Sequence, residues 1–175
     1  MKKLTKKLFL IGPMGAGKTS VGRFLAKQLQ CDFYDSDEEI EKRTGVNLTW
    51  LYDIEGESGF QEREIKVLDE LTSLPSIILS TGGGSVEIPE VCELLRSRGS
   101  IIYLQVSLAT QLDRLKHDKK RPSLQGTEDP EAVLVRLWPH REQLYQKLAD
   151  FSVMTDNRSV RDVCKDILAW LGIES

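Results

Sequence analysis

The chain has 175 residues, 40% of them hydrophobic and 29% charged, which suits one well-buried core and excludes two ordinary domains. A net charge of −3, without a long basic stripe, argues against broad binding to nucleic acid or an anionic membrane. No apolar run has membrane-spanning length, and the one before Gly12 is too short for an export signal. The isolated cysteines and histidines predict structural side chains in a reducing compartment, so we expect a cytoplasmic protein.

Short apolar runs alternate with longer amphipathic stretches along the chain. Strands are expected at 8–11, 33–34, 77–79, 101–104 and 151–154. Helices are expected near 17–29, 36–55, 58–73, 88–98, 107–117, 130–149 and 159–171. This alternation predicts an α/β fold with a parallel sheet and helices on both faces. The polar span 116–129 is either a disordered loop or a functional lid.

The first strand leads directly into Gly12-Pro-Met-Gly-Ala-Gly-Lys18-Thr19, which matches the phosphate-loop pattern without a mismatch. In such a loop, backbone N–H groups and a helix N-terminus surround phosphate oxygens. Lys18 would contact the β- and γ-phosphates, and the Thr19 hydroxyl could bind Mg²⁺. We therefore expect a nucleoside triphosphate here, held by Gly12, Met14, Gly15, Ala16, Gly17, Lys18, Thr19 and Ser20.

Two carboxylates, Asp35 and Asp37, follow the second expected strand. The carboxyl end of a strand in a parallel sheet faces the crevice where ligands bind, so the pair could serve Mg²⁺ and a hydroxyl acceptor. The alternative is that Asp35 or Ser36 caps the next helix and Asp37 lies in its first turn. The neighbouring phosphate loop favours the functional interpretation.

Three further segments carry weaker signals. The run Thr81-Gly-Gly-Gly-Ser85 follows a strand, and three glycines favour close approach of a ligand, although a plain tight turn is the alternative. The cluster Lys119-Lys-Arg121-Pro122 lies in the polar span, where a mobile arginine could close over the transferred phosphate. Arg141 and Tyr145 lie one helical turn apart and could bind an anionic substrate. Taken singly, each arginine fits a solvated surface position better than a functional one.

Together these segments resemble the shikimate kinase family from about residue 7 to 170. The motifs that carry the resemblance are the phosphate loop, Phe33-Tyr-Asp-Ser-Asp37, Gly56-Glu-Ser-Gly-Phe60 with Glu64, Ser80-Thr-Gly-Gly-Gly-Ser-Val86, Lys120-Arg-Pro122 and Arg141 with Leu144-Tyr145. The resemblance implies a three-layer phosphate-loop kinase fold with a central five-stranded parallel sheet and a mobile lid. It also implies transfer of the γ-phosphate of ATP to the 3-hydroxyl of shikimate, giving shikimate 3-phosphate and ADP for chorismate and aromatic amino acid biosynthesis.

The resemblance further implies a role for each matching residue. Lys18, Asp37 and Arg121 would be catalytic, with Arg121 in the lid, and Thr19 and Asp35 would hold Mg²⁺. Shikimate would be bound by Asp37, Glu64, Gly82, Gly83, Gly84 and Arg141. Arg121 would also contact ATP. Two further arginines, Arg114 and Arg158, match positions that flank the adenine of ATP. We expect one kinase domain over 1–175, a substrate-binding helical segment at about 36–64, a lid at about 116–129 and a monomer.

One departure from the family concerns the substrate carboxylate. Members of the family usually carry a second arginine that binds this carboxylate, at the position where this chain has Gln61. Glutamine can donate a hydrogen bond there, but without a positive charge to strengthen it. Arg63 is an unsuitable replacement, because positions two apart on a helix point to different sides. A smaller departure is the sequence Arg141-Glu-Gln-Leu-Tyr145, in which relatives often have proline before Leu-Tyr; little effect beyond local helix geometry is expected.

Three other functions stay open at this point. A related kinase of gluconate or another polyhydroxy acid is consistent with Gln61, while the Asp-Ser-Asp and triple-glycine motifs count against it. A GTP-dependent switch would use Asp53-Ile-Glu-Gly56, but no guanine-binding Asn-Lys-x-Asp motif is present. A catalytically silent ATP-binding homologue is disfavoured because Lys18, Asp37 and Arg121 are all present.

Overall fold

The computed structural model describes residues 6–117 and 129–173. Within them one parallel sheet has the strand order β2-β3-β1-β4-β5. The strands are β1 (Leu8–Ile11), β2 (Asp32–Asp35), β3 (Ile77–Ser80), β4 (Ser100–Gln105) and β5 (Phe151–Met154). The five expected strands are therefore confirmed, and β1 lies at the centre of the sheet, between β3 and β4.

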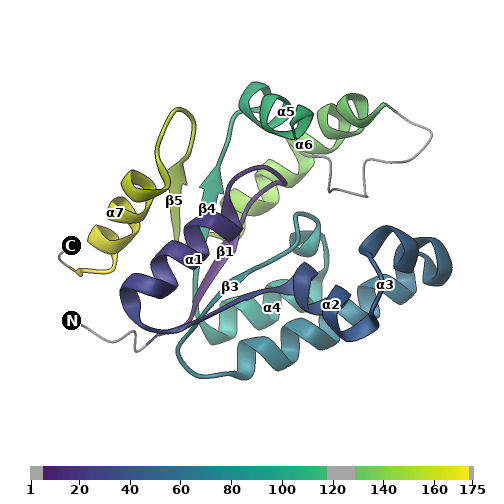
Figure 1. The fold of residues 1–175 in the computed structure, drawn as a ribbon, viewed down its shortest axis with the longest axis horizontal. Helices are drawn as coiled ribbons and strands as arrows, with labels where there is room; N and C mark the ends of the chain where they lie inside the picture. Colours follow the sequence, from purple (N-terminus) through teal and green to yellow (C-terminus); the bar gives the residue numbers. More distant parts are fainter. Residues whose placement is uncertain (1–5, 118–128, 174–175) are drawn as a thin grey trace.

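Helices cover both faces of the sheet (Figure 1). They are α1 (Lys18–Leu29), α2 (Ser36–Thr44), α3 (Leu48–Ser73), α4 (Pro89–Arg98), α5 (Leu108–Lys116), α6 (Pro130–Leu148) and α7 (Val160–Trp170), with a short 3₁₀ helix η1 (Ser85–Glu87). Successive side chains of a strand point to opposite faces. Leu8 and Leu10 accordingly pack with α1 and α7, whereas Phe9 and Ile11 pack with α3, α4 and α6. This is the expected three-layer α/β fold.

The expected helix over 36–55 is wrong, because the chain forms two helices there. Gly45 has a φ of 73° and ends α2, with its N–H bonded to Glu41 O at 2.8 Å. The Asn47 side chain then caps α3 by accepting from the Trp50 N–H at 2.9 Å. The second part of that expected helix, from residue 48 on, instead joins the expected helix over 58–73 in α3, with a kink at Gly56, whose φ is 73°. Glycine tolerates this backbone conformation, so both boundaries fall at glycines.

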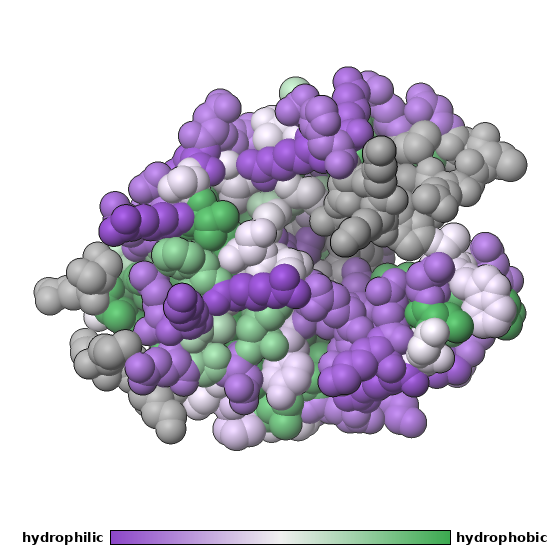
Figure 2. Space-filling view, in the orientation of Figure 1, coloured by the Kyte–Doolittle hydropathy of each residue, from purple (hydrophilic) through white to green (hydrophobic). Residues whose placement is uncertain are grey.

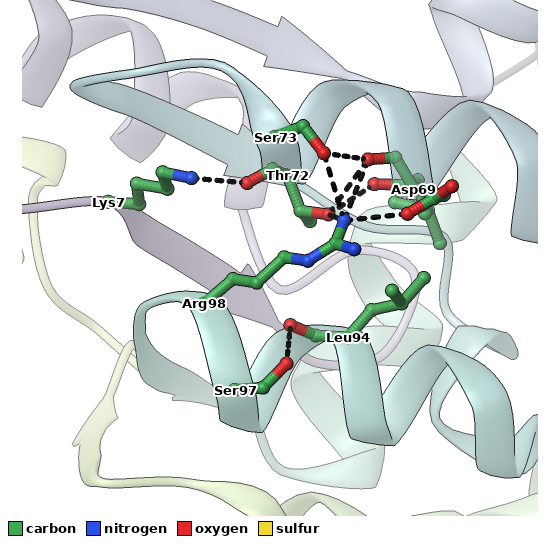
Figure 3. A network of polar contacts seen from close by, with 8 residues as sticks. Lys7, Asp69, Thr72, Ser73, Leu94, Ser97 and Arg98 are labelled. Carbon is green, nitrogen blue, oxygen red and sulfur yellow. Dashed lines mark hydrogen bonds and ion pairs between the residues drawn. The ribbon is translucent and has the colours of Figure 1, made fainter.

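The clamp formed by Arg98 joins the end of α4 to the end of α3 (Figure 3). Arg98 Nη1 donates to Asp69 O, Thr72 Oγ1 and Ser73 Oγ at 2.8, 2.8 and 3.1 Å, and it pairs with Asp69 Oδ1 at 2.7 Å. Lys7 Nζ, at the entry to β1, donates to Thr72 O at 2.6 Å. The bond from Lys7 satisfies a carbonyl that the last turn of α3 leaves unpaired. The bonds of Arg98 hold α3 and α4 together at the end remote from the phosphate loop.

The expected lid over 116–129, with Arg121, lies almost entirely outside the described residues. In the part of the chain that the structure covers, no helix combines the length and apolar composition that crossing a membrane requires. Figure 2 shows apolar side chains gathered at the outer end of α3, and that segment exposes Trp50, Tyr52 and Ile54. The same view shows a recess with hydrophilic side chains above α2, on the side where the strands end.

Candidate active site

The phosphate loop connects the central strand β1 to α1, as the sequence predicts. A methyl group added at Gly12 would lie 2.7 Å from the carbonyl oxygen of Leu104, so only glycine fits against β4. Lys18 Nζ folds back over the loop and donates to Gly12 O at 2.7 Å and to Pro13 O at 2.9 Å. The ammonium group therefore lies at the mouth of the loop, where terminal phosphates bind.

The other predicted loop residues occupy the same turn and the start of α1. Ala16 is buried and donates its N–H to Pro13 O at 3.1 Å, whereas Ser20 is exposed on the first turn of α1. Met14 borders a pocket lined by Pro13, Met14, Tyr103, Gln111, Leu134, Leu137, Trp138, Arg141, Glu142 and Tyr145. The loop thus adjoins both the sheet and α6.

Two arginines expected near adenine lie around the turn that follows β5. Arg114 of α5 donates from Nη1 to Gly15 O at 2.8 Å and from Nη2 to Thr155 O at 3.1 Å. Arg158 donates to Met154 O at 3.3 Å and pairs with Asp166 Oδ2 at 2.7 Å. Arg114 therefore touches the phosphate loop directly, whereas Arg158 is bound to its own turn and to α7.

Asp35 caps α2 and also contacts the phosphate loop. Its Oδ1 accepts from the N–H groups of Asp37 and Glu38 at 3.0 and 3.2 Å, which caps α2. Its Oδ2 accepts from the Thr19 hydroxyl at 2.8 Å. The cap fixes the carboxylate at the carboxyl end of β2, and the second oxygen faces the phosphate loop. A hydroxyl and a carboxylate oxygen side by side are the hard donors that Mg²⁺ prefers.

Asp37 lies at the start of α2, facing the glycine run. Burial, followed by the charges of Glu64 and Asp35, raises the pKa of the Asp37 carboxyl to about 7, although Lys18 opposes the shift. A methyl group added at Gly82 would lie 2.9 Å from Asp37 Oδ1 and 3.2 Å from Glu64 Oε1. A pKa near neutrality suits a group that accepts a proton from a hydroxyl.

Glu64 is 4% exposed and accepts a short hydrogen bond from the Ser85 hydroxyl. Burial raises the pKa of the Glu64 carboxyl, while the hydroxyl of Ser85 and the charge of Arg141 oppose the shift. Glu64 comes from the straight part of α3, after the kink. The Glu64 carboxyl therefore connects α3 to the glycine run and to Ser85, which follows the run.

Arg141 occupies the other end of the glycine run. A methyl group added at Gly84 would lie 3.1 Å from Arg141 Nη2, and one added at Gly83 would lie 4.0 Å from Nη1. Nη2 donates to Glu87 Oε2 at 3.0 Å, and the buried Nε has no hydrogen-bond partner among the described residues. Tyr145, one turn later on α6, donates its hydroxyl to Gly83 O. The run 82–84 is thus bounded by carboxylates at one end and a guanidinium at the other.

Gln61 makes its contact within its own helix, where its Nε2 donates to Glu57 Oε1 at 3.3 Å. Arg63 forms two 2.6 Å bonds to Glu55, also in α3. The guanidinium of Arg63 is therefore already paired with a carboxylate of the same helix.

Sequence reasoning assigned no role to Ser85, Glu87 or Gln111. Ser85 and Glu87 follow the glycine run directly, and that adjacency is the one signal for them in the sequence. Gln111 is 2% exposed, and its Oε1 lacks a partner in the described part of the chain. Only the folded chain brings Gln111 beside Gly15 and Met14.

A phosphate loop on the central strand, with a carboxylate of raised pKa across the crevice, defines an ATP-dependent phosphate-loop kinase of a small molecule. The family model described as shikimate kinase matches residues 14–172. The chain belongs to the shikimate kinase family.

The chain is similar to proteins that are known in sequence and in structure. It is 51% identical over 166 residues to the shikimate kinase of Buchnera aphidicola subsp. Schizaphis graminum, covering 95% of this chain and 96% of that protein. The solved shikimate kinase from Acinetobacter baumannii in complex with shikimate has a TM-score of 0.91 and 43% identity, covering 97% of this chain and 94% of that one. A gluconokinase from Sinorhizobium meliloti, 15% identical with a TM-score of 0.59, covers 98% and 94% and shares the fold alone.

Proposed function

We propose that the protein transfers the γ-phosphate of ATP to the 3-hydroxyl of shikimate, giving shikimate 3-phosphate and ADP. The observation that carries this proposal is the glycine run 82–84, with Asp37 and Glu64 at one end and Arg141 at the other. Shikimate is small, has several hydroxyls and bears one carboxylate. Its hydroxyls would suit the carboxylate end, and its carboxylate would suit the guanidinium end. Membership of the shikimate kinase family supports the same substrate.

The phosphate loop would bind the triphosphate. Lys18 would neutralise the β- and γ-phosphates once it leaves the carbonyls of Gly12 and Pro13, and loop N–H groups would donate to phosphate oxygens. Thr19 and Asp35 would hold Mg²⁺, the carboxylate through water, and the ion would supply charge neutralisation at the phosphates.

The acceptor end would do the proton chemistry. Asp37 would orient the attacking hydroxyl and accept its proton, as its raised pKa permits. Glu64 would shape the pocket, and Arg141 would pair with the substrate carboxylate. Arg121 would close over the transferred phosphate in the lid, and closure would exclude water that otherwise hydrolyses ATP. Arg114 and Arg158 would flank adenine.

The remaining parts of the proposal concern organisation. Residues 1–175 would form one kinase domain, with the substrate-binding segment at about 36–64 and the lid at about 116–129. The protein would act as a monomer in the cytoplasm, without nucleic acid or membrane partners. The net charge of −3 supports the expectation that no nucleic acid or anionic membrane is bound.

The test is ADP production from Mg·ATP with shikimate, gluconate, quinate or no acceptor, and with GTP in place of ATP. Selective stimulation by shikimate is expected. Turnover with gluconate or quinate but not with shikimate would mean that the substrate is a different hydroxy acid, bound by the same fold. A requirement for GTP would favour a GTP-dependent switch.

Two variants test the roles of individual residues. Asp37→Asn is expected to reduce kcat by at least about a hundredfold while ATP still binds; near-normal turnover would contradict its role at the acceptor. Arg121→Ala is expected to lower kcat far more than it weakens shikimate binding, as for a contact made mainly in the transition state. Equal losses in both would make Arg121 a ground-state contact.

A further inference from the structure

Glu87 is an acidic residue held at the guanidinium end of the glycine run. It ends the 3₁₀ turn η1, and its N–H bonds to Gly84 O at 3.0 Å, which places it directly beside the run. Its Oε2 accepts from Arg141 Nη2 at 3.0 Å, and a methyl group added at Gly84 would lie 3.4 Å from this oxygen. Arg141 is half-buried and Glu87 lies on its solvent side as an exposed residue, with side-chain exposures of 24% for Arg141 and 31% for Glu87.

The space that Glu87 faces is the one assigned to the substrate carboxylate. The same guanidinium nitrogen lies 3.1 Å from the position of a methyl group on Gly84, so a ligand above Gly84 meets Arg141 and Glu87 together. A carboxylate that binds Arg141 there must either displace Glu87 or share the guanidinium with it. Displacement breaks a charge-assisted hydrogen bond, and sharing brings two negative charges together.

The surroundings make this competition more severe. The carboxyl of Glu64 also interacts with Arg141, and Glu87 raises the pKa of the Glu64 carboxyl. Gln61 contributes no positive charge. The guanidinium of Arg141 thus interacts with the carboxylates of both Glu87 and Glu64.

We propose that Glu87 is a specificity-determining residue that competes with the substrate carboxylate for Arg141 and thereby raises the KM for the acidic substrate. The proposal rests on the proposed function, because it takes shikimate as that substrate. In the structure Glu87 binds Arg141 in place of a substrate anion. Its effect falls on binding of the acidic substrate and leaves the phosphate loop and the transfer step unchanged.

The first experiment compares the KM of shikimate in the parent, Glu87→Gln and Glu87→Ala. Glutamine keeps an oxygen that can accept from Arg141 but removes the charge, whereas alanine removes both. Both variants are expected to lower the KM by roughly three- to tenfold, with kcat and the KM of ATP within about twofold of the parent. A KM that rises in Glu87→Ala would show that Glu87 positions Arg141, and an unchanged KM in both would also overturn the proposal.

A matched control separates this contact from the general field of the protein. Glu90→Gln removes the same charge from an exposed position at the start of α4, three residues further along. It is expected to leave the KM of shikimate unchanged. An equal decrease in Glu90→Gln and Glu87→Gln would assign the effect to long-range electrostatics and overturn the proposal.

Shikimate methyl ester, used as a competitive ligand, tests whether the effect acts through the carboxylate. The ester lacks the charge that competes with Glu87, so its inhibition constant is expected to be the same in the parent and in Glu87→Gln. An equal improvement for acid and ester would indicate an indirect structural effect. If the parent neither binds nor phosphorylates shikimate, the proposed function itself fails; if it does both and Glu87→Gln matches it, only this inference fails.

Discussion

The hydroxyl of Tyr145 donates to the carbonyl of Gly83 and so joins α6 to the glycine run across 62 positions of sequence. The Tyr145 ring also stacks on Tyr103 of β4, with centroids 5.0 Å apart. Burial raises the pKa of the Tyr145 hydroxyl, which keeps it a protonated donor at neutral pH. Arg141 lies one turn earlier on α6. The bond from Tyr145 therefore helps to fix the distance between the Arg141 guanidinium and the backbone of Gly83 and Gly84.

Tyr145→Phe removes that donor and leaves a carbonyl of the glycine run unpaired. We expect a loss of about 1–2 kcal/mol in the free energy of unfolding and a several-fold rise in the KM of shikimate. Urea unfolding and steady-state kinetics measure the two effects. Tyr52→Phe, at an exposed position of α3, is the control and should change neither. A normal KM in Tyr145→Phe would show that the bond does not position Arg141.

Asp37→Asn should make stability depend less on pH. Burial and the neighbouring carboxylates raise the pKa of Asp37 from 3.8 to about 7 in the folded protein. The stabilisation associated with its neutral form is therefore complete below about pH 4 and is lost as the pH rises through about 7. Asparagine cannot ionise, so the Tm of the variant should approach that of the parent at pH 4 and exceed it at pH 8. A Tm difference that stays constant across this range would contradict the raised pKa.

The same pKa predicts how activity follows pH. If the ionised Asp37 accepts the hydroxyl proton, kcat/KM for shikimate should rise with pH and reach half its plateau at about 7. Steady-state rates from pH 5.5 to 9 would measure this. A midpoint below pH 5 would mean that Asp37 is fully ionised in the working enzyme and that burial does not raise its pKa.

Gln61→Arg introduces a charged donor at the position where the family resemblance implies a second arginine partner for the substrate carboxylate. Gln61 now bonds weakly to Glu57, at 3.3 Å, within α3. A guanidinium there should lower the KM of shikimate by roughly three- to tenfold, because hydrogen bonds between charged partners are stronger than neutral ones. Gln28→Arg, exposed on α1, adds the same charge elsewhere and should have no effect. An unchanged KM would contradict this prediction. It would indicate that the new arginine pairs with Glu57 and does not reach the substrate carboxylate.

Arg98→Ala tests the clamp between α3 and α4. It removes three hydrogen bonds and an ion pair from a side chain that is 30% exposed, so we expect a loss of about 1–3 kcal/mol of stability. Turnover should stay within about twofold of the parent, since the clamp lies at the end of the helices remote from the site. Arg96→Ala, exposed two residues earlier, should lose less than about 0.5 kcal/mol. Denaturant unfolding of both variants gives the comparison.

Much of the fold could be read from local patterns, and the error at 36–55 shows where that method fails. A helical pattern reports which residues can share a buried face, and this face continues across Gly45 into α3. The break depends on one glycine at a φ of 73° and on the Asn47 cap, neither of which changes the hydrophobic period. The expected break at 56–57 coincides with the kink at Gly56, which the chain crosses without ending α3.

The sequence alone determined the phosphate loop, the alternation of strands and helices, and the family, because these depend on residues close together in the chain. Tertiary structure decided the partners of the acceptor site. Glu64 meets Ser85 across 21 positions, and Arg141 meets Glu87 across 54. The strand order β2-β3-β1-β4-β5 brings the carboxyl ends of distant strands to one edge of the sheet, and no local pattern encodes which side chains meet there. The charge that Arg141 encounters before any substrate arrives was therefore decided by the fold.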